Sequence, residues 1–179
     1  MWVPELLTPR LRLRPLRLAD SGDLYELLRE PAATRFLPFE PTPELVWEHV
    51  LESVAARYTP GMGSFVWEER ETGRFVGHGD LRPSQETEDE RIETGWYLMR
   101  RYRGRGLAVE ATRAILRHAF RTMDLPEVIA LVHEENEASR RVARRLGFRI
   151  EQCGTYYGGP HLLYTVDSRS GQQDPEAVQ

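Results

Sequence analysis

The sequence predicts a single domain of the α/β (α+β) class, built on a mixed sheet with helices on both faces. Strand-like and helix-like periodicities alternate along the chain in the order β-α-α-β-β-β-α-β-α-β-β. Residues 128–132 form an uninterrupted apolar run, which is typical of a central strand buried on both sides. At 179 residues the chain is long enough for one substantial core and short for two domains.

Composition narrows the class of protein. The net charge of −4 argues against a dedicated nucleic-acid binder, which is usually basic. No stretch approaches eighteen apolar residues, so we expect no membrane span, and the first residues lack the layout of a signal peptide. The single cysteine, Cys153, permits no internal disulfide, and we expect a buried thiol in a cytoplasmic protein.

The chain opens with a strand and a helix. Leucines alternate with arginines within residues 8–18, which predicts a half-buried strand, and Pro15 confines that strand to an edge or an end. Asp20 or Ser21 can then cap a helix that continues to Leu28.

Residues 31–43 contain three prolines and predict a loop. The loop carries an apolar cluster, Phe36, Leu37 and Phe39, which either lines a ligand site or folds back onto the core. Thr42 is a plausible cap for the next helix, because Pro43 fits its first position.

The middle of the chain predicts three strands. Residues 64–69 and 74–81 flank Thr72-Gly73, which makes a hairpin of the first two. The polar, acidic residues 84–89 predict a loop, and residues 92–99 predict the third strand.

The last third predicts two helices and three strands. A helix spans residues 107–122, and a second helix runs from a cap at Asn136 to Gly147. The strands are residues 128–132, 148–150 and 162–166. We therefore assign residues 1–167 to one domain and expect the polar residues 168–179 to be a disordered tail.

Residues 101–106, Arg-Tyr-Arg-Gly-Arg-Gly, connect the strand at 92–99 to the helix at 107–122. Glycines allow close backbone approach, a helix start attracts anions, and arginines add charged donors, so this loop predicts a phosphate site. It is not a dinucleotide fingerprint, because the third glycine position holds Val109, and it is not a P-loop, because the chain contains no lysine.

The pattern Arg-x-x-Gly-x-Gly resembles the acetyl-CoA pyrophosphate loop of the GNAT N-acetyltransferases. Residues 91–111 resemble that family's strand, loop and helix, and residues 133–148 resemble its next helix, with Asn-x-x-Ser followed by Leu-Gly-Phe. Residues 9–14, Pro-Arg-Leu-Arg-Leu-Arg, resemble the opening strand of the branch that includes the ribosomal-protein N-terminal acetyltransferases. The resemblance covers about residues 8–167.

The resemblance implies a GNAT fold: a mostly antiparallel sheet of about seven strands, splayed between the fourth and fifth. It implies acetyl-CoA as the donor, lying in that gap, and no metal. The residues that it assigns to the cofactor are Tyr97, Leu98, Met99, Arg101, Arg103, Gly104, Arg105, Gly106, Leu107, Ala108 and Asn136.

It further implies transfer of an acetyl group to a primary amine by direct attack. The amine must be neutral to attack, and Glu93 is the candidate base, the alternative being a surface glutamate in a half-exposed strand. Ser139 is the candidate acid near the sulfur, the alternative being an ordinary polar residue in a first helical turn. Many members of the family use a tyrosine as the acid, which leaves Tyr156, Tyr157 and Tyr164 as rivals.

The acceptor stays open between a protein N-terminus and a small-molecule amine. A non-catalytic acyl-CoA-binding or sensing module of the same fold is the alternative function. The five histidines show no metal-ligand spacing. Dimerisation is common in the branch, which leaves a homodimer open, and the length of the acyl group is open too.

Overall fold

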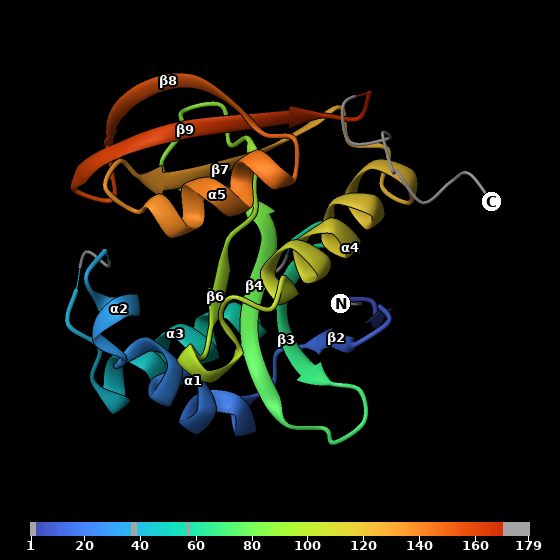
Figure 1. Cartoon of the computed structure of the whole chain (residues 1–179), viewed down its shortest axis with the longest axis vertical. Helices are drawn as coiled ribbons and strands as arrows, with labels where there is room; N and C mark the ends of the chain where they lie inside the picture. Colours follow the sequence, from blue (N-terminus) through green and yellow to red (C-terminus); the bar gives the residue numbers. More distant parts are fainter. Residues whose placement is uncertain (1–2, 37–38, 57, 170–179) are drawn as a thin grey trace.

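The computed structural model describes residues 3–36, 39–56 and 58–169 and forms one sheet with helices on both faces (Figure 1). The strands lie in the order β1-β2-β3-β4-β5-β7-β9-β8, and β6 pairs with β4 beside β5. The strands are β1 (Leu6–Leu7), β2 (Leu11–Pro15), β3 (Gly63–Glu69), β4 (Phe75–Pro83), β5 (Ile92–Glu93), β6 (Trp96–Leu98), β7 (Glu127–His133), β8 (Arg149–Tyr156) and β9 (Gly159–Asp167). The helices are α1 (Ser21–Leu28), α2 (Pro31–Thr34), α3 (Pro43–Ala55), α4 (Leu107–Arg121) and α5 (Glu137–Arg145), with 3₁₀ turns η1 (Leu18–Asp20) and η2 (Arg100–Tyr102).

Alternation along β3 divides the core into two layers. Phe65 and Trp67 face the cluster that includes Ile115 of α4 and Ala143 of α5. Val66, between them in the strand, faces the cluster formed by α1 and α3. Because successive strand side chains point to opposite faces, α4 and α5 cover one face of the sheet and α1 and α3 the other, as the sequence predicted.

The sheet opens between β6 and β7. β5 joins the two halves, since Glu93 pairs with Ile129 of β7 in the one parallel step, and β4 pairs with β5 at Arg82 and Pro83. Beyond that point β6 stays with β4, while β7 continues with β9 (Figure 1). All other pairings are antiparallel, so the predicted splayed, mostly antiparallel sheet is confirmed.

The predicted strand at residues 92–99 is broken in two. Its middle is held by Asp80 of β4, whose Oδ1 accepts from the Gly95 N–H at 2.7 Å and whose carbonyl accepts from the Thr94 hydroxyl at 2.7 Å. The Thr94 N–H meanwhile bonds to the Ile129 carbonyl at 2.9 Å. This break, together with the two-residue β1, explains nine short strands where about seven were expected.

Glycines in β4 allow the layers to approach closely. A Cβ on Gly77 would lie 2.2 Å from the Tyr97 carbonyl oxygen, and one on Gly79 would lie 2.5 Å from the Trp67 ring. Both contacts are shorter than van der Waals distance, so larger residues would push β6 or Trp67 out of place. The Gly-His-Gly motif of β4 therefore has a packing role.

Other expectations near the ends of elements differ. The predicted loop at 31–43 contains α2, and β8 extends beyond residue 150 to Tyr156. The prediction of a buried thiol was wrong: Cys153 is exposed, because β8 is an edge strand and most of its residues are uncovered. Residues 170–179 of the predicted tail lie outside the described residues, as does Leu37, and the domain boundary at 167 stays a prediction.

Candidate active site

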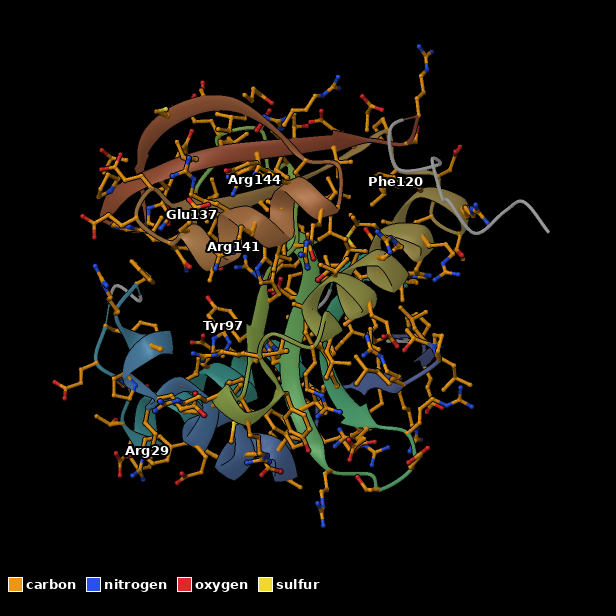
Figure 2. All side chains as sticks on the ribbon, in the orientation of Figure 1. Arg29, Tyr97, Phe120, Glu137, Arg141 and Arg144 are labelled. Atoms are coloured by element: carbon orange, nitrogen blue, oxygen red, sulfur yellow. The ribbon has the colours of Figure 1, made fainter. Side chains whose placement is uncertain are left out.

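A cavity of about 690 Å³ lies at the opening of the sheet. One part of its wall comes from β6, the loop before α4, β7 and α5, and another part comes from β4, α1 and α3. Figure 2 shows Tyr97 on β6 and Arg141 on the side of α5 nearest to it, and both residues line the cavity. The cavity thus joins segments that are far apart in the sequence.

The loop before α4 forms one end of the cavity. Gly104 and Gly106 both have φ of 76°, a left-handed conformation that costs other residues energy, and α4 begins directly after them. The first N–H groups of α4 have no acceptor within the helix and point toward this end. Arg103 donates to the Leu98 carbonyl at 3.0 Å, which ties the loop to β6. The loop end can therefore hold an anion.

Arg10, in the loop before β2, bonds both to the loop before α4 and to α4 itself. Its guanidinium donates to the Arg105 carbonyl at 2.9 Å and to Glu110 of α4 at 2.6 Å. Glu110 also accepts from the Thr8 hydroxyl at 2.6 Å. The opening Pro-Arg-Leu-Arg segment thereby fixes the loop carbonyl and the first turn of α4 together.

Helix α5 contributes both polar and charged groups to the cavity. The Asn136 side chain caps the helix by accepting from the Ser139 N–H at 3.1 Å, and Ser139 lines the cavity. Arg141 and Arg145, one helical turn apart, line it as well. Arg145 lies beside α4, since its carbonyl accepts from Arg113 at 3.5 Å.

Glu93 lies at the other end, opposite Arg82 of β4, whereas Leu98 lies opposite Gly77 of the same strand. It is 5% exposed, and its carboxylate accepts from the Ser84 hydroxyl at 2.7 Å. The Tyr157 hydroxyl donates to the carboxylate and lies 3.0 Å from both oxygens. Burial, followed by the nearby charge of Asp80, raises the pKa of Glu93 above its ordinary value. The alternative of a surface glutamate is wrong.

A second carboxylate near Glu93, that of Asp80, is partly buried. Arg82 donates through Nε to Asp80 at 3.1 Å and through Nη2 to the Tyr157 hydroxyl at 3.2 Å. The Tyr157 hydroxyl thus receives a bond from Arg82 and gives one to Glu93. These bonds form one chain in which two carboxylates share a single arginine.

The three tyrosines that are candidates for the acid lie in different surroundings. Tyr164 is 1% exposed within the main core. The Tyr156 hydroxyl accepts from Gln152 at 2.6 Å, and its ring packs against Ile129 and Leu163. Of the three, only Tyr157 lines the cavity, where it bonds the candidate base.

Most of the predicted site residues come together in the cavity. Those lining it are Glu93, Ser139, Tyr97, Leu98, Arg103, Gly104, Gly106, Leu107, Ala108 and Asn136. Three others do not line it: Met99 packs between the two cores, Arg101 donates to the Phe75 carbonyl at 3.3 Å, and Arg105 stacks on the Tyr102 ring. Burial raises the pKa of Tyr97 to about 12, so this phenol stays neutral.

Several cavity residues were not predicted as site residues, namely Asp80, Arg82, Arg141 and Arg145. The four-residue spacing of the two α5 arginines is a signal that could have placed both on one helical face. Asp80 and Arg82 carry no comparable signal, because the register of β4 against β5 and β6 decides what they face.

The cavity suits a long ligand with phosphates at one end. Gly104, Gly106 and the single arginine Arg103 line it at the loop. Within the described residues β6 pairs with β4 alone, so its other edge is available to an extended amide chain. The buried carboxylate at the far end suits proton transfer. Fold and site together define an acyltransferase that uses a coenzyme A thioester.

The chain belongs to the GNAT family of acetyltransferases, whose Acetyltransferase (GNAT) domain model matches residues 10–149. It is an acetyl-CoA-dependent N-acetyltransferase of that family. It is 31% identical over 167 residues to FsC-acetyl coenzyme A-N(2)-transacetylase of Aspergillus fumigatus, covering 88% of this chain and 70% of that protein.

Solved structures share the fold. A GNAT-family acetyltransferase from Bacillus anthracis superimposes with a TM-score of 0.79 at 22% identity, covering 93% of this chain and 99% of that one. The ribosomal-protein acetyltransferase RimL in complex with coenzyme A superimposes with a TM-score of 0.72 at 19% identity, covering 92% and 98%. The predicted resemblance to the ribosomal-protein branch is therefore confirmed at the level of fold.

Residues 3–36, 39–56 and 58–169 contain neither a candidate membrane span nor a candidate metal site. None of the helices in this part of the chain is both apolar and long enough to cross a bilayer. Likewise, no three of its histidine, cysteine, aspartate and glutamate side chains gather in a way that could hold a metal ion.

Proposed function

We propose that the protein acetylates a primary amine by direct attack of that amine on acetyl-CoA, with Glu93 as general base and Ser139 as general acid. The observation that carries this proposal is a single cavity with an anion-binding loop at one end and a buried, hydrogen-bonded carboxylate at the other. Acetyl-CoA supplies the activated acetyl group. Its phosphates suit Gly104, Gly106 and the nearby arginines, and its amide chain suits the free edge of β6.

Glu93 suits the role of base on two grounds. Its raised pKa brings its proton affinity closer to that of the amine, which favours transfer near neutral pH. Tyr157 and Ser84 donate to its oxygens and hold the carboxylate in one orientation. We therefore assign Tyr157 to positioning the base rather than to the acid.

Ser139 suits the role of acid by its place. Its N–H is held by Asn136 in the first turn of α5, and the residue lines the same cavity as Glu93. A hydroxyl there can give a proton to the departing sulfur. Substitutions can test the roles of Ser139 and Glu93 independently, since the two residues lie on different elements.

Release of coenzyme A is the measurement that tests the proposal, with peptide N-termini and small amines as acceptors. We expect turnover by the native chain, a loss of roughly 10²-fold or more in kcat for Glu93→Gln, and a smaller loss for Ser139→Ala. Calorimetric affinity for coenzyme A should be unchanged in Glu93→Gln. Tight coenzyme A binding without turnover of any amine would instead favour the non-catalytic module.

Three narrower predictions accompany this function. We propose a cytoplasmic setting and acetyl as the transferred group, and either a protein N-terminus or a small amine as the acceptor. Whether the chain forms a homodimer stays open, and sedimentation or light scattering of the purified protein would decide it.

A further inference from the structure

The cavity that contains Glu93 has one apolar wall. Side chains from the helical half of the chain form it, and they include Leu24, Leu28, Phe36, Phe39, Leu45 and Val46. Phe39 is 43% exposed and Leu45 is 45% exposed, so this wall is not closed over by the rest of the described protein. An apolar surface that lines a cavity beside a catalytic group favours an apolar part of a ligand.

The charges at this end are unbalanced. Asp80 and Glu93 are both buried or partly buried, and Arg82, which donates to Asp80 and to Tyr157, is the one cation between them. Two carboxylates and one guanidinium leave one negative charge when Glu93 is ionised. A protonated amine entering here would neutralise that charge before giving its proton to Glu93.

Among the described residues, no arginine besides Arg82 bonds to Asp80, Glu93 or Tyr157, where a carboxylate on the acceptor would lie. Of the described residues that line the cavity, four are arginines. Arg103 donates to the Leu98 carbonyl and to Glu30. Arg145 lies beside α4, and Arg141 is exposed on α5. The fourth, Arg82, is already shared between Asp80 and Tyr157.

Of the four histidines that line the cavity, His78 adds no positive charge at this end. His78 of β4 lines the cavity and is 5% exposed, and burial lowers its pKa to about 4, so it is neutral at physiological pH. Its Nε2 has no hydrogen-bond partner among the described residues. A neutral imidazole with a free nitrogen can bond an uncharged polar group of a ligand and offers a carboxylate little.

We propose that the acceptor is a primary amine on an apolar body with no carboxylate next to the amine, and that free α-amino acids are rejected. An alkyl or arylalkyl amine meets this description, and so does an apolar N-terminal residue whose carboxyl group is in a peptide bond. This inference rests on the proposed function, because it names the chemistry of the acceptor for the same site.

A matched pair of amines tests the role of the carboxylate. 2-Phenylethylamine and L-phenylalanine differ only by that group. Phenylalanine has the less basic amine, so a larger fraction of it is neutral near pH 7, and a preference for phenylethylamine cannot come from the fraction of neutral amine. We expect kcat/KM for phenylethylamine to exceed that for phenylalanine by roughly 100-fold or more, because like charges oppose each other at a buried site. L-Phenylalanine amide, which restores the bulk without the charge, should be acetylated nearly as well as phenylethylamine.

The apolar wall is tested by shortening the side chain of the acceptor. Glycinamide should have a kcat/KM roughly 10-fold or more below that of phenylalanine amide, as expected when a hydrophobic pocket is left unfilled. Equal values would show that the wall does not contact the acceptor and would overturn that part of the proposal.

A charge added to the wall should change the selectivity. His49 of α3 lines the cavity, and Glu52 of the same helix is exposed and does not. We expect His49→Arg to reduce the preference for phenylethylamine over phenylalanine by about 10-fold. Glu52→Arg, the matched control, should leave the preference unchanged.

The outcomes separate this inference from the proposed function. Turnover of phenylalanine at a rate comparable to phenylethylamine would overturn the inference and leave the acetyltransferase intact. If neither amine is turned over although coenzyme A binds, the proposed function fails for this class, and calorimetric binding of the two amines to the coenzyme A complex still compares them. Equal affinities there would also overturn the inference.

Discussion

The two ends of the cavity are built in opposite ways. The phosphate end comes from one continuous stretch, β6, the arginine-glycine loop and the start of α4, with α5 beside it. The amine end is assembled from β4, β5, the turn between β8 and β9, and helices α1 and α3. One end depends on local backbone geometry, and the other depends on contacts between residues distant in the chain.

The electrostatics of the two ends differ in the same way. Arg141 and Arg145 are exposed, so solvent and salt weaken their attraction for an anion. Glu93, by contrast, is buried and bonded by Tyr157 and Ser84. The phosphate end therefore provides affinity for an anionic ligand, whereas the amine end provides a carboxylate, Glu93, with a raised pKa. Substitutions at the two ends should consequently affect different kinetic constants.

The largest effect is expected at the amine end. Glu93→Gln removes the base without changing its size, and we expect kcat/KM for the amine to fall by roughly 10²- to 10⁴-fold, measured by coenzyme A release. Glu88→Gln, an exposed change in the neighbouring acidic loop, is the control and should keep near-native activity. A loss of less than threefold in Glu93→Gln would remove Glu93 from the mechanism.

At the phosphate end we expect a change in affinity. Arg141→Gln should raise KM for acetyl-CoA by about 10-fold at low salt and leave kcat nearly unchanged, because a charged hydrogen bond to phosphate is lost. Arg144→Gln is the matched control, since Arg144 pairs with Glu137 and does not line the cavity (Figure 2). Added salt should reduce the difference in KM for acetyl-CoA between the native chain and Arg141→Gln.

Tyr157→Phe tests how the base is held. The Tyr157 hydroxyl lowers the pKa of Glu93, against the opposing effects of burial and Asp80, so its removal should raise that pKa further. The acidic limb of the pH profile of kcat/KM should then move to higher pH, and activity should largely return above it. A uniform loss of activity at every pH, with no shift of the limb, would assign Tyr157 another role.

The smallest effect is expected on stability. Burial and Asp80 raise the pKa of Glu93 in the folded protein above its value in the unfolded chain, so ionised Glu93 destabilises the fold at neutral and higher pH. Glu93→Gln should therefore have a higher Tm than the native chain at pH 8, and the difference should shrink as the pH falls toward the ordinary carboxyl range and be gone below it. A lower Tm at pH 8 would mean that the Ser84 and Tyr157 hydrogen bonds outweigh the cost of burying the charge.

Much of the fold could be predicted because its signals are local. Thr42 caps α3 by accepting from the Leu45 N–H at 3.2 Å, and Asn136 caps α5, as their positions indicated. The break between β5 and β6 could not be predicted, since Asp80 causes it from fifteen residues earlier in the chain. Cys153 was misjudged for a similar reason: only the sheet order shows that β8 lies at an edge.

By itself, the sequence predicted acetyl-CoA as the donor and the loop that we propose holds its phosphates. Glycines, arginines and a helix start predict such a loop, and all of them lie in consecutive residues. In the structure, both glycines adopt the left-handed conformation. Only the tertiary structure decided the amine end, where Asp80, Arg82, Glu93 and Tyr157 meet through strand register and a turn. The physical reason is that burial and pairing set the pKa of a carboxylate, and both are properties of the folded chain.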